Sequence, residues 1–239
     1  MDRPVVYIVG AGPGDTDLIT VKGKALLDRA EVLVYAGSLV NPALVASSPA
    51  AVKIDSWGLG LEEIVFQTEQ YAKAGKLVVR LHSGDPSLFG AIVEQMEELE
   101  KRGIATEIVP GVSSLFAAAA ALKIELVLNG ITDAVAITRP AGKTLEEDHI
   151  PELSETGATI AVFLGSDRFF EVTQRLRCPP DTPAAVVYHA SWPDQKIVRG
   201  TVSDIADKAT EAGITKTALL IIGRVVDPQG EYRRSHLYS

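Results

Sequence analysis

The segment VVYIVGAGPGD, residues 5–15, decides the fold of this chain. A short β-branched and aromatic run passes directly into glycines, which is the pattern of a buried strand that ends in a tight turn. Stretches of helical character separate it from similar runs at 31–35, 51–55, 76–82 and 106–111. This alternation predicts a mostly parallel sheet with helices between its strands.

The same pattern starts again after a small-residue helix that follows residue 114. Strand-like runs lie at 134–139, 159–165, 184–190, 196–201 and 218–226. We therefore predict an α/β protein with two α/β domains, residues 1–115 and 116–239. A cleft between tightly joined halves is the expected ligand site. The strongest helical period covers 88–102, with Gly103 as its stop.

Composition narrows the function classes. Of the 239 residues 46% are hydrophobic, the formal net charge is −8, and Cys178 is the one cysteine. An acidic chain is a poor nucleic-acid binder, and a lone cysteine rules out an intramolecular disulfide. No apolar run reaches the roughly 20 residues of a membrane helix, and residues 1–10 lack a signal-peptide pattern. We expect a cytoplasmic protein with a small-molecule partner, no nucleic acid and no membrane.

The first glycine loop resembles a dinucleotide-binding turn but departs from it. Its glycines are Gly10, Gly12 and Gly14, a spacing that differs from G-x-G-x-x-G, and Pro13 removes an amide donor. The second predicted strand ends in Tyr35, where a nicotinamide enzyme carries an acidic residue for the ribose. For any single glycine, a simple turn is the competing explanation. As a set at a strand end, the loop lies where α/β folds bind ligands.

A second loop, SGDPSLFG at 83–90, follows the fourth predicted strand. A Gly-Asp-Pro turn at a strand end exposes backbone donors and acceptors, which can bind a small polar ligand without a charged side chain. Taken alone, this loop could equally be an Asp-capped turn.

Five motifs occur together in one order along the chain. They are VGAGPGDTDLITVKG at 9–23, SGDPSLFG at 83–90, PGVSS at 110–114, TPAAVVYHASWPDQKIVRGT at 182–201 and ALLIIGRVV at 218–226. With them the chain resembles the S-adenosylmethionine-dependent tetrapyrrole (corrin/porphyrin) methyltransferases. The resemblance implies two α/β domains with S-adenosyl-L-methionine in the cleft between them, a homodimer and a tetrapyrrole substrate.

The resemblance also implies cofactor-binding residues. Four of the matches are substitutions: Ser83 for a glycine, Ser113-Ser114 for Thr-Ala, Leu164 for a methionine and Ala190 for a glycine. The full implied set is Pro13, Ser83, Gly84, Asp85, Leu88, Ser113, Ser114, Leu164 and Ala190.

Within the family, YAGSLV at 35–40 and HASWPDQKIVRGT at 189–201 resemble the branch that methylates ring carbon 11 of precorrin-4 or cobalt-precorrin-4 in cobalamin biosynthesis. One departure is Asn129-Gly130, which stands where that branch has a leucine-proline pair. The expected substrate contacts are Gly12, Tyr35, Ser38 and His82. Whether the substrate carries cobalt stays open.

Methyl transfer from a sulfonium to an enamine-like carbon requires positioning above all. We therefore expect no metal site and assign no general base. Arg80, Arg139, Arg168 and Arg199 are either partners for substrate carboxylates or members of surface ion pairs. The alternatives are methylation at another ring position, a family relative that methylates RNA or a protein, a nicotinamide-dependent oxidoreductase, and a noncatalytic binding protein.

Overall fold

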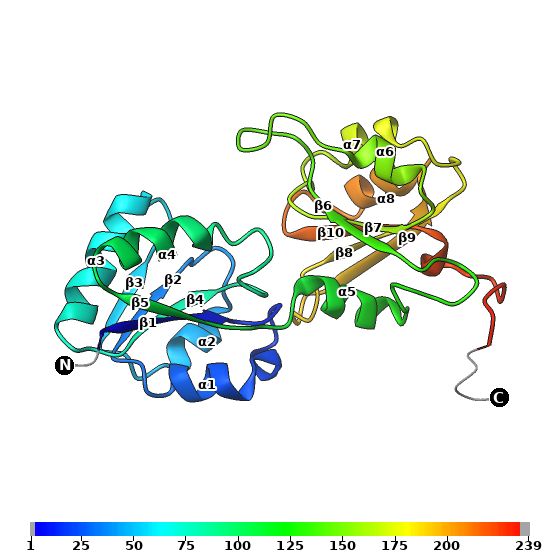
Figure 1. Cartoon of the computed structure of the whole chain (residues 1–239). Coiled ribbons are helices and arrows are strands. Elements are labelled where there is room, and N and C mark those ends of the chain that lie inside the picture. The colour runs from blue at the N-terminus through cyan, green and yellow to red at the C-terminus, as the bar shows by residue number, and fades with distance from the viewer. Residues whose placement is uncertain (1–2, 235–239) are drawn as a thin grey trace. The chain divides into compact units, whose positions relative to one another are not determined.

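The computed structural model describes residues 3–234 and divides into two compact units on either side of the Ser114–Leu115 peptide bond (Figure 1). Each unit contains one five-stranded sheet.

The sheet of the first unit is parallel throughout, with strand order β3-β2-β4-β1-β5. Because all strands run the same way, their carboxyl ends meet at one edge of the sheet. We call the loops that follow these strand ends the first edge. The strands are β1 (Val5–Gly10), β2 (Val32–Tyr35), β3 (Val52–Asp55), β4 (Val78–His82) and β5 (Ala105–Val109).

Helices cover both faces of this sheet. The helices α1 (Val21–Leu27) and α2 (Pro42–Ser47) pack on one face through a cluster that includes Leu27, Leu44 and Val79. The opposite face carries α3 (Leu61–Lys73) and α4 (Ile92–Lys101). The neighbouring strands β1 and β4 are therefore followed by helices on opposite faces, an arrangement that opens a ligand crevice at the strand ends of α/β sheets.

The helix α4 begins at Ile92, four residues later than the periodicity of 88–102 predicts. Phe89 and Ala91 have left-handed backbone, with φ of 54° and 47°, and an α-helix cannot include such residues. Residues 83–91 therefore form a long irregular loop at the first edge. At its other end α4 stops as predicted, with Gly103 at φ 78°.

The sheet of the second unit is mixed, with order β6-β7-β10-β8-β9. The parallel pair β6 and β7 lies beside β10, which runs antiparallel to both β7 and β8, and β8 and β9 are also antiparallel. The repeated strand pattern of the sequence does not reveal these directions. The strands are β6 (Val135–Thr138), β7 (Thr159–Val162), β8 (Pro183–Tyr188), β9 (Lys196–Thr201) and β10 (Ala218–Ile222).

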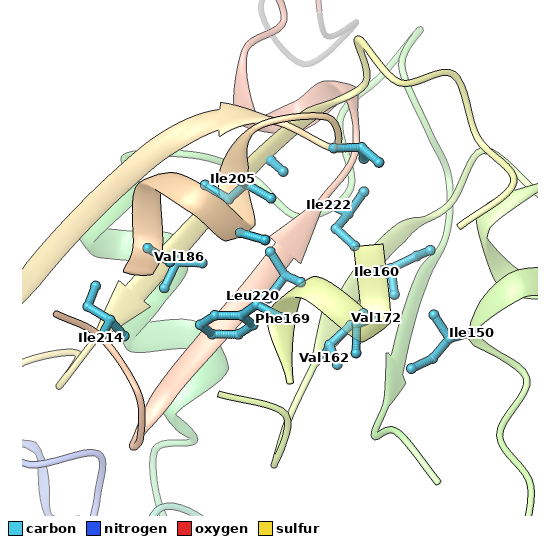
Figure 2. Packing of buried hydrophobic residues seen from close by; sticks show 14 residues of the cluster. Ile150, Ile160, Val162, Phe169, Val172, Val186, Ile205, Ile214, Leu220 and Ile222 are labelled. Carbon is cyan, nitrogen blue, oxygen red and sulfur yellow. The ribbon is translucent and has the colours of Figure 1, made fainter. Parts of the chain in front are cut away.

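Alternate residues of these strands face two different helical layers. Ile160, Val186 and Leu220 point toward α6 (Ile150–Ser154), α7 (Phe169–Arg175) and α8 (Ile205–Glu211), as Figure 2 shows for part of this cluster. Cys178 packs against the same cluster. The other face is covered by the alanine-rich α5 (Ser114–Leu122), whose small side chains pack directly against the strands. Two 3₁₀ turns complete the elements, Thr16–Leu18 and Arg224–Val226.

Candidate functional site

Three loops of the first edge are joined by backbone contacts. They follow β1, β4 and β5, which are neighbours in the sheet. Gly12 and Gly84 exchange two backbone hydrogen bonds, with N···O distances of 3.3 and 2.8 Å. The Ala11 amide donates to the His82 carbonyl at 2.6 Å. The first and second sequence motifs therefore form one continuous structure.

Close packing explains why this structure needs glycines. A Cβ on Gly10 would lie 2.5 Å from the Gly111 Cα and 2.7 Å from the Gly84 oxygen. A Cβ on Gly111 would collide with the same Gly84 oxygen. Contact between separate loops therefore requires glycine at Gly10 and Gly111, whereas Gly84 has left-handed backbone, with φ of 62°.

Asp85 ties the second loop to the third. Its Oδ2 accepts a hydrogen bond from the Gly111 amide at 2.8 Å, and its Oδ1 accepts one from the Ser87 amide at 2.8 Å. Both carboxylate oxygens are thus engaged by backbone amides. The bond to Ser87 forms the Asp-capped turn that the sequence suggested. The bond to Gly111 adds a link between the second and third loops.

The residues of the first unit that the resemblance implies for cofactor binding gather at this edge. The Cα of Ser113 and the amide of Ser114 both lie 3.8 Å from the point where a Gly84 Cβ would sit. The Leu88 amide donates to the Asp85 carbonyl at 3.2 Å. Ser113 is buried, whereas Pro13, Ser83, Leu88 and Ser114 are partly accessible.

The geometry of the first loop is unsuited to a pyrophosphate. The amides of Ala11 and Gly12 already donate within the protein, and Pro13 has no amide proton. The next α-helix begins only at Val21, with the Thr20 side chain as its cap. A dinucleotide site needs free amides that lead directly into a helix N-terminus. The residues present fit a cofactor without phosphates, such as an adenosyl amino acid.

The Tyr35–Val40 turn is fixed to its neighbours by two side chains. Asn41 Nδ2 donates to the Gly14 carbonyl at 2.7 Å, while its Oδ1 caps α2 at the Ala43 amide. Asp55 Oδ1 accepts from the Gly37 amide at 2.9 Å. The implied substrate residues Gly12, Tyr35 and Ser38 therefore share the first edge, with Ser38 exposed.

Our sequence reasoning did not include Asn41 or Asp55. Asn41 precedes a proline, which is an N-cap signal. Asp55 ends the third predicted strand, and a polar residue at a parallel strand end is itself a pointer to the ligand edge. Either signal was available in the sequence.

His82, the last residue of β4, uses its ring within the loop that follows. Its Nδ1 lies 2.7 Å from the Ser83 carbonyl, and a hydrogen bond to the Gly90 backbone also supports the charged ring. Burial is the strongest influence and lowers the pKa of His82; Arg80 lowers it further, against those two backbone contacts and Asp85. The imidazole is therefore neutral at pH 7. A role toward substrate stays a prediction.

The four arginines considered as carboxylate partners all contact the protein itself. Arg139 donates to Thr144, Arg168 to the Ala141 carbonyl, and Arg199 to the carbonyls of Val226 and Leu122.

Arg80 donates from its Nε to Gln95 Oε1 at 3.4 Å, but it is buried and its Nη1 has no hydrogen-bond partner among residues 3–234. Burial lowers the pKa of Arg80 to about 10, and the charge of Asp55 opposes that shift.

In the second unit, Leu164 and Ala190 lie at the ends of β7 and β8, beside the start of β10. We call the loops that contain Leu164, Ala190 and Thr217 the second edge. The backbone is left-handed at Leu164, at His189 and Ser191 on either side of Ala190, and at Thr217, with φ between 46° and 71°. Such backbone is costly for residues with a Cβ and gathers at functional sites. Leu164 is 59% exposed, and Ala190 is buried.

Side chains hold the second edge together. Ser166 Oγ donates to the Ala218 carbonyl and accepts from the Ala218 amide, both at 3.0 Å. His189 Nδ1 lies 2.9 Å from Asp194, a contact that lowers the pKa of Asp194, and its ring stacks on Tyr188 with centroids 3.9 Å apart. The ring of His189 is thus engaged within the protein at its Nδ1 and on one face.

The Asn129-Gly130 departure lines a separate cavity of the second unit. This cavity has a volume of about 740 Å³ and is bounded by residues 125–133 and 232–234. Elsewhere, the described part of the chain has no group of three or more His, Cys, Asp and Glu side chains arranged to hold a metal ion.

Comparison with known proteins agrees with this geometry. The chain is 48% identical to the cobalt-precorrin-4 C(11)-methyltransferase of Methanocaldococcus jannaschii, over 97% of this chain and 96% of that protein. It is 43% identical to the precorrin-4 C(11)-methyltransferase of Rhodococcus erythropolis, over 98% and 96% of the two chains.

Solved structures similar to this chain are also tetrapyrrole methyltransferases. The X-ray structure of a cobalt precorrin-4 methyltransferase, a cobalamin biosynthetic enzyme, superposes with a TM-score of 0.90 at 46% identity, covering 94% of this chain and 96% of the other. A Thermus thermophilus uroporphyrin-III C-methyltransferase in complex with S-adenosylhomocysteine has a TM-score of 0.81 at 30% identity, with 93% of each chain covered.

The family model of the tetrapyrrole (corrin/porphyrin) methylases matches residues 5–206, which include the loops of the first edge and, at the second edge, Leu164 and Ala190. This match confirms the resemblance that the five motifs indicated, and the two-unit α/β architecture agrees with it. The chain belongs to the tetrapyrrole (corrin/porphyrin) methylases.

Proposed function

We propose that this protein transfers the methyl group of S-adenosyl-L-methionine to ring carbon 11 of precorrin-4 or cobalt-precorrin-4. The observation that carries the proposal is the first glycine loop, where the Ala11 and Gly12 amides donate within the protein while Pro13 stays partly accessible. Relatives named for carbon 11 methylation, 43–48% identical over nearly the whole chain, support the ring position.

The cofactor residues divide into two groups. At the first edge, Gly84, Pro13 and Ser83 present backbone and small side chains, and Leu88 adds an apolar contact. Asp85 acts as a positioning residue, because its carboxylate fixes the loops through the Gly111 and Ser87 amides. Ser113 and Ser114 complete this group. The second group consists of Leu164 and Ala190, at the second edge.

The substrate is bound beside these loops by Gly12, Tyr35, Ser38 and His82. Bound S-adenosylmethionine supplies an activated methyl group on a sulfonium. The residues of the two sites would orient the tetrapyrrole toward that group, and orientation of two reactants in a near-attack geometry is worth roughly 7–11 kcal/mol of barrier. A neutral His82 would add no positive charge to a site that takes a cationic cofactor. These residues thus act by placement and by exclusion of water.

Calorimetry and product analysis test the proposal together. We expect binding of S-adenosylhomocysteine and none of NADH, and carbon-13 NMR of product made with a labelled methyl donor should place the new methyl on carbon 11. A methyl group at another ring position would reject the ring assignment alone. Binding of NADH without a response to S-adenosylhomocysteine would reject the cofactor.

The variant Asp85→Ala sharpens this test. Loss of two charge-assisted hydrogen bonds should weaken S-adenosylhomocysteine binding by about 10- to 100-fold. The matched control is Asp207→Ala, an exposed carboxylate on α8. If Asp85→Ala binds as the wild type does, the loops do not depend on this carboxylate.

We also propose that the protein is a cytoplasmic homodimer. None of the helices in the described residues has the length and apolar character required to cross a bilayer. β6 is an edge strand with the side chains of Val135 and Ile137 exposed, and uncharged strand edges are available for pairing. Light scattering on the purified protein measures the oligomeric state.

A further inference from the structure

We propose that the loop after β3, Asp55 to Trp57, is a second part of the tetrapyrrole-binding site. In this proposal Trp57 contacts the macrocycle, and Asp55 is a positioning residue that holds Trp57 beside the Gly37 turn. The proposal rests on the proposed function, because it adds residues to the substrate site assigned there. Neither residue belongs to the motifs that indicated the family.

Asp55 binds two loops through one oxygen. Its Oδ1 accepts hydrogen bonds from the Gly37 amide and from the Trp57 amide, both at 2.9 Å. The two amides are therefore joined through a single atom. Gly37 belongs to the Tyr35–Val40 turn, so the backbone of Trp57 is fixed against the segment that was assigned to the substrate.

Further contacts make this junction rigid. β2 and β3 are parallel neighbours with Tyr35 opposite Asp55, and Ser56 donates from both its amide and its Oγ to the Tyr35 carbonyl, at 2.7 and 3.0 Å. A Cβ on Gly37 would collide with Asp55 Oδ2. The carboxylate thus packs directly on the turn, and Gly37 leaves the space that it needs.

Trp57 is unusual because it is large, apolar and 70% exposed on this fixed backbone. Leu39 in the neighbouring turn is 48% exposed, so two apolar side chains project from adjoining loops of the first edge. Exposed apolar groups that gather at a ligand edge mark binding surfaces. A tetrapyrrole offers a broad conjugated face, and an indole ring is the side chain best suited to stack on it.

Asp55 also acts on Arg80 through its negative charge. That charge raises the pKa of the buried Arg80, while the Asp55 carboxylate makes its hydrogen bonds to the Gly37 and Trp57 amides. Substitution by asparagine keeps an oxygen acceptor for those amides and removes the charge. Substitution by alanine removes both. The pair of variants therefore separates positioning of the loop from electrostatic support of Arg80.

Steady-state kinetics with precorrin-4 and S-adenosylmethionine test the inference. We expect Trp57→Ala to raise the KM for the tetrapyrrole by about 10-fold, the size of a lost aromatic stack, with an unchanged KM for S-adenosylmethionine. Trp57→Phe should restore most of the affinity. The matched control is Phe66→Ala, which removes an aromatic side chain that is 52% exposed on α3 and should leave both KM values unchanged.

The Asp55 variants complete the test. Asp55→Ala should raise the same KM by a similar factor, and Asp55→Asn should stay close to the wild type. Calorimetry with S-adenosylhomocysteine should give wild-type affinity for every variant, which shows that each is folded. A wild-type protein that neither binds this ligand nor methylates would reject the proposed function. A wild-type KM in Trp57→Ala, with methylation intact, would reject only the present inference.

Discussion

The first edge and the second edge hold their loops by different means. Where the three loops of the first edge meet, the backbone approaches so closely that no Cβ fits on Gly10 or Gly111. At the second edge, residues with full side chains, such as Leu164 and His189, adopt the left-handed backbone that usually belongs to glycine. Space therefore limits substitution at Gly10 and Gly111, whereas backbone strain limits it at Leu164 and His189.

This difference separates two kinds of mutational effect. Adding one carbon at the first edge forces backbone atoms of neighbouring loops apart, and this movement disturbs the site and the fold together. Removing a side chain at the second edge relieves strain and leaves the neighbouring loops in place.

The largest effect is expected for Gly111→Ala. Its new Cβ meets the Gly84 oxygen and lies 2.8 Å from the Gly10 Cα, and these are backbone atoms that cannot turn aside. We expect a loss of about 3 kcal/mol in the free energy of unfolding, with loss of S-adenosylhomocysteine binding. Urea unfolding and calorimetry measure the two quantities.

The control is Gly142→Ala in the second unit. The nearest atom to its new Cβ is Arg168 Nη2 at 3.6 Å, an ordinary contact. Its stability should change by less than about 0.5 kcal/mol. Equal effects of the two substitutions would show that the close glycine contacts are not what limits the first edge.

A smaller effect is expected at Leu164, where φ is 52°. Leu164→Ala keeps the strained backbone with a Cβ, while Leu164→Gly removes the strain. The glycine variant should therefore be more stable than the alanine variant by about 1 kcal/mol, although glycine normally destabilises relative to alanine. Thermal unfolding of the two variants measures the difference, and an advantage for alanine would contradict the strain argument.

The smallest effect concerns the pH dependence of stability through His82, the half-buried imidazole of the first edge. Burial lowers its pKa, so below about pH 6.5 the unfolded chain takes up a proton that the folded protein resists. Stability should consequently fall as the pH drops through and below that value. In His82→Asn this part of the pH dependence should be absent. A variant whose urea midpoint changes with pH as the wild type does would show that His82 does not titrate in this way.

Much of the fold could be predicted because strand patterns and turn residues are local signals. The run at 5–10 and the helix stop at Gly103 agree with the structure. The late start of α4 could not be predicted, because the left-handed backbone at Phe89 and Ala91 depends on how residues 83–91 pack around His82. The antiparallel direction of β10 was equally hidden, because a short buried strand has the same pattern in either direction.

The candidate site was likewise predictable only in part. Motif order predicted which loops gather at the first edge, and Gly12 and Gly84 do meet there. It did not predict how they are held, because the Gly111 contact with Asp85 and the Gly37 contact with Asp55 join residues far apart in the chain. Such long-range bonds leave no periodic trace in the sequence, so the partners of Asp55 and Asn41 emerged only from the structure.

The contact between Gly10, Gly84 and Gly111 also constrains how this gene can change. Every single-base substitution that replaces a glycine codon with that of another amino acid introduces a Cβ, and at Gly10 or Gly111 that atom meets the backbone of another loop. A second mutation cannot easily compensate, because the obstacle is main chain rather than a side chain that could be shortened. At Gly10 and Gly111 we therefore expect only synonymous codon changes to be tolerated. Left-handed positions of the second edge, such as Leu164, can instead accept glycine.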